Sequence, residues 1–125
     1  MLFFSALLLV TIGLAHSYLG ERYILIRLFR RDNIPKVLGS SAFTKSTLRF
    51  AWHLTTLCWF GFAGILISLS NAPLDRRAVL NIIAAIFLVH FLMAFAGSKG
   101  KHFSWLFFLS ISLATFYVAN ISSMY

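Results

Sequence analysis

The sequence has few charged residues, and acidic residues are the rarest of them. Only 11% of its 125 residues are charged, and Asp and Glu together number 3. A water-soluble domain normally carries about a quarter of its residues as charged side chains. Because 60% of the residues are apolar and the mean hydropathy is +0.87, the composition excludes a soluble globule and predicts a membrane protein.

Cysteine and proline are also scarce, and their scarcity excludes further classes of protein. The single cysteine, Cys58, has no second cysteine in the chain for a disulfide or for thiol–disulfide catalysis. We interpret it as a small buried apolar side chain. With 2 Pro and 7 Gly, collagen-like and disordered chains are excluded as well.

Four long stretches of the sequence contain no Lys, Arg, Asp or Glu. A helix needs roughly 20 mostly apolar residues to cross the hydrocarbon core of a bilayer. We therefore expect membrane-spanning helices over about residues 2–20, 50–70, 78–97 and 102–121. The predicted fold class is all-α, with residues 1–125 forming a single integral membrane domain, a four-helix transmembrane bundle.

Basic residues lie mostly on one side of the predicted spans. Segment 21–49, between the first two spans, carries seven of the 11 Lys and Arg residues, and Lys99 and Lys101 lie on the same side. Only Arg76 and Arg77 lie on the other side. The positive-inside rule then places segment 21–49 in the cytoplasm and both termini outside, which is the periplasm if the membrane is a bacterial inner membrane. This topology explains the net charge of +8, so nucleic acid is not an expected partner.

Residues 18–31, YLGERYILIRLFRR, have the pattern of a short interfacial amphipathic helix between the first two spans. Arginines spaced three and four residues apart share one side, and apolar residues occupy another. Pro35 then ends the helical pattern. The alternative is that these charges only hold the segment in the cytoplasm. The residues expected to bind anionic lipid headgroups are Arg22, Arg27, Arg30, Arg31 and Arg49.

Histidines are the most informative polar residues of the predicted spans. His16 and His53 lie about 6 Å inside the basic boundary and His90 about 10 Å inside it, while His102 lies at the surface of the same side. Neutral imidazoles bind haem iron and transition metals, so His16, His53 and His90 are predicted cofactor ligands. Together with His102 they form a candidate metal set. The alternative is that each histidine only hydrogen-bonds a neighbouring helix.

The other polar residues include no catalytic set. Glu21, Tyr18 and Thr56 lie close to the depth of the histidines and complete a predicted polar cluster. No carboxylate lies inside a predicted span, so proton-coupled transport through a buried Asp or Glu is not expected. Glu21 is expected to form a boundary salt bridge, with Arg22, Arg49 or Lys45 as its partner.

Small residues predict where the helices pack, since contacts between helices in lipid favour close approach of the backbones. Gly61 and Gly64 lie three residues apart in the second span, and Ala84 and Ala85 lie in the third. The third helix is expected to begin with an N-cap supplied by Asn71 or Asp75.

These features predict a small multi-pass membrane protein that is not an enzyme and has no catalytic residues. Its expected role is that of an accessory or partner-binding subunit, with the lipid bilayer and other membrane subunits or further copies of itself as partners. A redox or transport component that binds haem or a transition metal through the histidines is the alternative. A site for a lipid or quinone headgroup is the third hypothesis.

Overall fold

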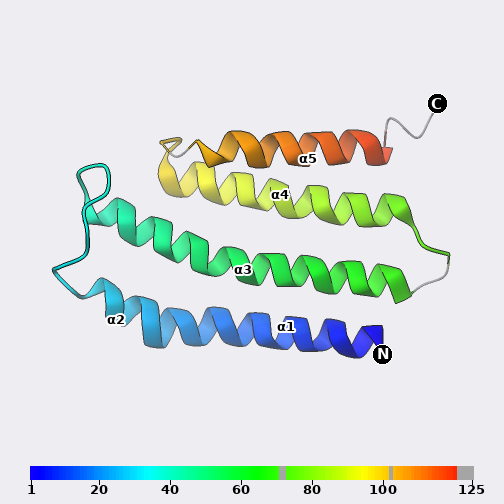
Figure 1. Cartoon of the computed structure of the whole chain (residues 1–125), viewed down its shortest axis with the longest axis horizontal. Helices are drawn as coiled ribbons and strands as arrows, with labels where there is room; N and C mark the ends of the chain where they lie inside the picture. Colours follow the sequence, from blue (N-terminus) through cyan, green and yellow to red (C-terminus); the bar gives the residue numbers. More distant parts are fainter. Residues whose placement is uncertain (71–72, 102, 121–125) are drawn as a thin grey trace.

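The structure, a computed structural model, describes residues 1–70, 73–101 and 103–120. In these ranges all regular secondary structure is helical (Figure 1). The prediction of an all-α fold is therefore confirmed. The elements in chain order are α1 (Leu2–Leu19), the π-helical stretch η1 (Gly20–Leu25), α2 (Ile26–Phe29), α3 (Ser41–Ser70), α4 (Arg76–Ser98) and α5 (Ser104–Asn120).

Three helical stretches within the described ranges are long and apolar enough to cross a membrane. They are Leu2–Phe29, Ser41–Ser70 and Arg76–Ser98. The fourth long helix, α5, is also apolar, but its 17 residues rise only about 26 Å. That length is slightly less than the roughly 30 Å of a typical hydrocarbon core. The architecture is therefore that of a helical membrane protein with three candidate spans.

The predicted interfacial helix is not a separate element. The chain continues from α1 through η1 into α2 as one helical stretch that ends at Phe29. Gly20 keeps a helical backbone (φ −62°, ψ −47°), and no proline occurs before Pro35, so nothing interrupts the helix. The prediction of a distinct second helix is wrong because the amphipathic pattern extends the first helix by about 10 residues and does not start a new one.

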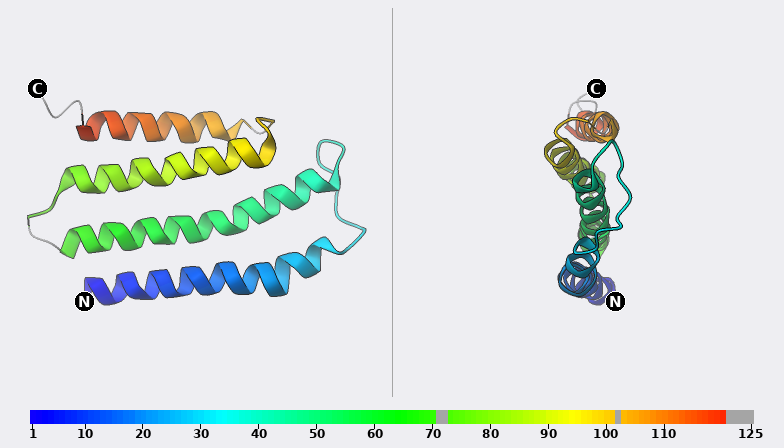
Figure 2. Two further views of the ribbon diagram at one scale, coloured as in Figure 1. Left: turned by 180° about the vertical axis from the view of Figure 1, so that it is seen from behind. Right: turned by 90° about the vertical axis from the view of Figure 1, so that its left-hand side faces the viewer.

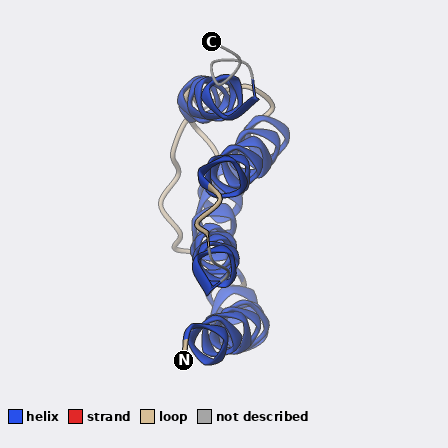
Figure 3. Cartoon of the chain, turned by 90° about the vertical axis from the view of Figure 1, so that its right-hand side faces the viewer, coloured by secondary structure: helices blue, strands red, loops and turns tan. Residues whose placement is uncertain are grey.

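The four long helices lie side by side in chain order and form one curved layer (Figures 2 and 3). In the described part of the chain, α1 packs on α3, α3 on α4, and α4 on α5, without comparable packing between other pairs of these helices. A closed bundle would surround a common core, and this layer does not. Few large side chains are buried as a result, and the buried apolar residues are mostly alanines: Ala6, Ala63, Ala84, Ala94 and Ala119.

Predicted packing and capping residues occupy the expected places between α3 and α4. A Cβ atom on Gly61 would overlap the side chain of Ile86, and one on Gly64 would lie 3.6 Å from Ile82. Both glycines therefore face α4, as predicted from their spacing. At the start of α4, Asp75 Oδ1 accepts a hydrogen bond from the Ala78 amide at 3.1 Å, which confirms Asp75 as the N-cap. The other candidate cap, at position 71, lies outside the described residues.

Candidate functional site

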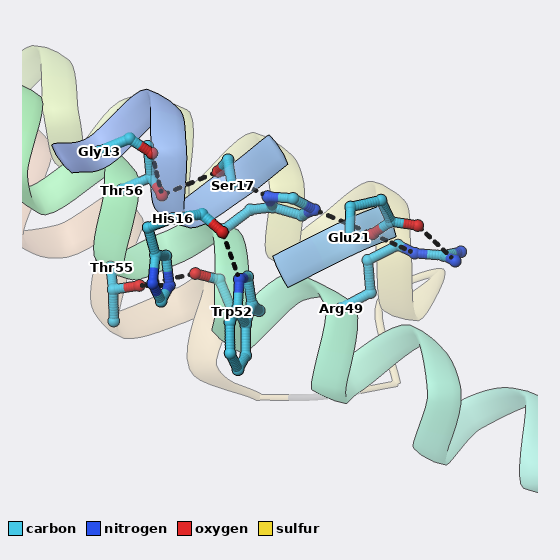
Figure 4. Close-up of polar contacts among 9 residues, drawn as sticks. Gly13, His16, Ser17, Glu21, Arg49, Trp52, Thr55 and Thr56 are labelled. Carbon is cyan, nitrogen blue, oxygen red and sulfur yellow. Dashed lines mark hydrogen bonds and ion pairs between the residues drawn. The ribbon is translucent and has the colours of Figure 1, made fainter. Parts of the chain in front are cut away.

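Polar side chains gather at one end of the interface between α1 and α3 (Figure 4). On α3, Arg49, His53 and Thr56 follow one another at spacings of four and three residues, so they share one face of the helix. They meet Ser17 of α1 and Glu21 of η1. We call these five side chains the polar ladder.

The inner half of the polar ladder is a chain of hydrogen bonds. Ser17 Oγ lies 2.8 Å from both His53 Nδ1 and Thr56 Oγ1, and Thr56 Oγ1 donates to the Gly13 carbonyl at 3.3 Å. A hydroxyl has one proton to donate, so the direction of the chain depends on His53. If Nδ1 of His53 carries a proton, it donates to Ser17, and Ser17 donates to Thr56. If Nδ1 carries none, Ser17 donates to the imidazole instead.

Glu21 forms the outer end of the polar ladder. Arg49 Nη2 lies 2.8 Å from Glu21 Oε1, and Arg49 Nε donates to Oε2 at 3.1 Å, so the guanidinium binds both carboxylate oxygens. His53 Nε2 lies 3.2 Å from the same Oε2 atom. Of the three predicted partners of Glu21, the structure selects Arg49. The side chains of Arg49 and Glu21 are 48% and 30% exposed, which makes this a boundary contact.

His16 lies beside the polar ladder on the same interface, with its ring stacked on Trp52 (Figure 4). The two ring centroids are 4.5 Å apart, and Trp59 meets the imidazole edge-on at 5.0 Å. The Trp52 indole donates to the His16 carbonyl at 3.1 Å. Thr55 Oγ1 donates its proton to the Trp52 carbonyl and lies 3.0 Å from His16 Nε2, so Nε2 is the donor of that second bond.

The stacking of Trp52 depends on Gly20, a contact that sequence reasoning missed. A Cβ atom on Gly20 would overlap the indole ring of Trp52. Gly20 also begins the π-helical stretch, and such stretches are common where a helix adapts to a functional or packing constraint. The feature of the sequence that could have predicted this contact is that Gly20 and Trp52 lie at similar depth on two consecutive antiparallel helices.

His90 lies in a different environment, between α3, α4 and α5. Its side chain is buried, with 2% of the residue exposed. Nδ1 donates to the Ile86 carbonyl at 2.8 Å, and Nε2 lies 3.6 Å from the sulfur of Cys58. The rings of Phe87 and Phe108 pack around the imidazole at 5.5 Å and 5.3 Å between centroids. Cys58 is thus a free, half-buried thiol beside a histidine.

The three described histidines do not form one ligand set. His16 contacts Trp52 and Thr55, His53 contacts Ser17 and Glu21, and His90 contacts Ile86 and Cys58. Among the described residues, no three His, Cys, Asp or Glu side chains are close enough together to hold a metal ion. This arrangement favours the alternative in which each histidine hydrogen-bonds across or along the helices. The predicted ligand at position 102 lies outside the described residues.

The other predicted site residues are placed separately. Tyr18 is 66% exposed and lies outside the polar ladder, whereas Glu21 and Thr56 belong to it. The arginines predicted to bind lipid headgroups are exposed along η1, α2 and the first residues after them, and their binding of lipid stays a prediction. They are Arg22, Arg27, Arg30 and Arg31, while Arg49 is bound to Glu21.

A smaller polar contact at the opposite end of the layer joins α4 to α5. Asn120 Oδ1 accepts two bonds from the Arg77 guanidinium, at 3.0 Å and 2.8 Å, and Asn120 Nδ2 donates to Asn81 Oδ1 at 2.8 Å. Sequence reasoning did not pair these residues. Their position near the ends of two consecutive helices was the only signal available.

Comparisons with protein-family models, with curated proteins and with solved structures find no match for this chain.

Proposed function

We propose that the chain is a four-span membrane protein without catalytic activity, and that it acts as an accessory subunit by packing against another membrane protein. In this proposal α5 is the fourth span. The basic connections face the cytoplasm, and α1 begins and α5 ends on the outer, periplasmic side of a bacterial inner membrane.

The observation that carries the proposal is the open layer of helices (Figure 3). α1 has one long-helix neighbour, α3, and α5 has one, α4, so the layer has two open edges. Helices in lipid associate through close packing and hydrogen bonds and not through burial of apolar surface from water. An edge helix with one neighbour still offers most of its circumference for such packing, which suits a partner helix.

The outer face of α1 has a shape that fits a partner helix. A shallow groove runs along it, with Ser5, Thr11 and Ala15 as its small residues and Leu8 and Ile12 as ridges. Ser5 and Thr11 donate their hydroxyl protons to carbonyls four residues earlier in the chain, so both side chains lie against α1. Small residues in such a groove allow close approach of a second helix.

The hydrogen-bond pattern supports a structural role for the polar side chains. In the described part of the chain, every buried side-chain nitrogen or oxygen atom has a hydrogen-bond partner. The polar ladder connects α1 with α3, and the contact of Asn120 connects α5 with α4. These polar groups already bind one another, whereas a catalytic site needs groups directed at a substrate.

Assembly is tested by purifying the chain with mild detergent and measuring the mass of the intact complexes by native mass spectrometry. We expect complexes of defined stoichiometry, either with a second membrane protein or with further copies of this chain. Thr11→Trp fills the groove on α1 and is expected to dissociate them. Leu14→Trp is the matched control, because Leu14 is 58% exposed on the same helix but does not line the groove. A strictly monomeric wild-type protein would contradict the proposal.

Topology is tested by cysteine labelling in intact cells with a membrane-impermeant maleimide, after Cys58 is replaced by alanine. We expect Asp75→Cys to be labelled from outside and Lys36→Cys only after the cells are permeabilised. Labelling of both positions from the same side would exclude the four-span arrangement.

A further inference from the structure

A groove opens between α3, α4 and α5, at the end of the layer that carries the basic connections. Its inner part has a volume of about 260 Å³ and is lined mainly by apolar residues, including Ala51, Ala94 and Phe108. A wider outer part adjoins it, and Phe50 and Met93 line both parts. The two parts therefore border each other along the contact between α3 and α4.

The outer end of the groove is basic. Lys45, Arg49 and His53 line it, all from α3. The chain has three acidic residues, and within the described structure only Glu21 contacts basic side chains, those of Arg49 and His53. Lys45 is half-buried and has no carboxylate partner among the described residues. Lys45 and Arg49 are two cations against the single carboxylate of Glu21, so at least one positive charge is uncompensated at the outer end.

The groove exists because small residues face each other across it. Ser46 Oγ donates to the Gly97 carbonyl at 3.3 Å, which ties α3 to α4 at the outer end. A Cβ atom on Gly97 would lie 3.8 Å from Ser46 Oγ, an ordinary contact distance. Because Gly97 lines both parts of the groove, a larger side chain at this position is expected to occupy it.

From this combination we propose that the groove binds one anionic phospholipid, with its phosphate beside Lys45 and Arg49 and one acyl chain against Phe50 and Met93, which line the same outer part. Basic pockets between spanning helices on the cytoplasmic side suit anionic headgroups. A free phosphate ion would leave the apolar lining of the groove uncovered. A zwitterionic lipid would bring the positive charge of its own headgroup close to Lys45. The inference rests on the proposed function only in placing α3 and α4 in the membrane.

The test measures lipid binding to the full-length, purified chain by native mass spectrometry. Phosphatidylglycerol and phosphatidylcholine with the same acyl chains are titrated separately, and inorganic phosphate is added as a competitor. We expect phosphatidylglycerol to bind the tightest site more strongly than phosphatidylcholine. One headgroup–lysine contact corresponds to a factor of about five in affinity. Phosphate at equal concentration should not displace the lipid.

Two substitutions and a control assign the binding to this groove. Lys45→Gln should weaken phosphatidylglycerol about fivefold and leave phosphatidylcholine unchanged. Gly97→Leu should weaken both lipids, because it fills the space for the acyl chain. Lys101→Gln removes the same charge at the same end of the molecule but does not line the groove, so it should have no effect. Circular dichroism verifies that each variant keeps its helices.

Three outcomes would overturn the inference: equal affinity of the wild type for the two lipids, equal effects of Lys45→Gln and Lys101→Gln, or displacement of the lipid by phosphate. The last outcome would identify a simple anion site. The measurement uses the chain without any partner. Its failure therefore leaves the accessory-subunit proposal standing, and failure of the assembly test leaves the lipid site standing.

Discussion

The two outer interfaces of the layer hold their helices together in different ways. Between α1 and α3, hydrogen bonds and an ion pair follow one another along the polar ladder (Figure 4). Between α4 and α5, aromatic rings and small residues predominate: Phe91 and Phe95 contact Trp105, and Phe87 contacts Phe108. Both kinds of contact can hold helices together in lipid, where burial of apolar surface from water does not drive their association.

The difference between the interfaces lies in what fixes the register of the helices. In the polar ladder, a shift of α1 along α3 would break the bonds of Ser17, Glu21 and Thr56 at once. In the α4–α5 interface, a ring that loses one aromatic neighbour can meet another. We therefore expect single substitutions to disturb the α1–α3 interface more than the α4–α5 interface.

The largest effect is expected from Gly20→Ala. The added methyl group would overlap the indole of Trp52, a rigid ring that also stacks on His16. Overpacking of this kind costs typically 1–3 kcal/mol of stability. The measurement is loss of helical circular dichroism as the mole fraction of SDS rises in mixed micelles. We expect the unfolding midpoint to move to a clearly lower SDS fraction.

Two glycines on α3 provide the controls for Gly20→Ala. A methyl group on Gly61 would meet the end of the flexible Ile86 side chain, which can rotate away, so a smaller loss is expected. A methyl group on Gly64 would lie at ordinary contact distance from Ile82, so the midpoint should hardly move. If all three substitutions shifted the midpoint equally, the contact of Trp52 with Gly20 would have no special role.

The next effect is expected from Ser17→Ala, which removes two bonds of the polar ladder, to His53 and to Thr56. Hydrogen bonds between helices in a membrane contribute about 0.6 kcal/mol each on average, so we expect a loss of about 1 kcal/mol in the same SDS assay. Ser5→Ala is the control, because Ser5 bonds only to its own helix. An equal loss in both variants would show that the polar ladder does not hold α1 to α3.

How much of the fold the sequence predicts depends on which interaction decides it. Uncharged runs and the lack of proline predict helices well, because backbone hydrogen bonding in a helix is local. The continuation of α1 to Phe29 was missed because apolar periodicity alone does not show where one helix ends. The open layer was also missed, since it depends on which faces of the helices meet.

The candidate site shows the same limit. Depth along each helix follows from the rise per residue and predicts similar levels for His53, Thr56 and Glu21, and in the structure these three side chains belong to the polar ladder. Depth does not show in which direction around the helix axis a side chain points, and this rotation decides which neighbours it meets. It separates His90 from His16 and His53, and it leaves Tyr18 exposed beside the polar ladder. Residues at equal depth can therefore contact different neighbours.

A smaller effect is expected from Glu21→Gln, which keeps the shape of the side chain but removes its charge. The pair with Arg49 is partly exposed, and such pairs contribute about 1 kcal/mol or less. The difference between wild type and variant should shrink as salt is raised, because ions screen an exposed pair. Asp32→Asn is the control, since Asp32 forms no ion pair with any described residue. A loss independent of salt would mean that the hydrogen bonds accepted by the second carboxylate oxygen matter at this position and the charge does not.

The smallest effect is expected from Ser112→Ala in the α4–α5 interface. Ser112 Oγ donates to the Ala84 carbonyl at 2.8 Å, but that carbonyl lies inside α4 and also accepts the bond of the helix itself. Alanine keeps the residue small, so the helices stay at the same distance, and we expect a loss of about 0.5 kcal/mol. If Ser112→Ala instead cost as much as Ser17→Ala in the SDS assay, the one bond of Ser112 would stabilise the α4–α5 interface as much as the two bonds of Ser17 stabilise the α1–α3 interface. The contrast between a polar interface with a defined register and a more tolerant aromatic one would then be wrong.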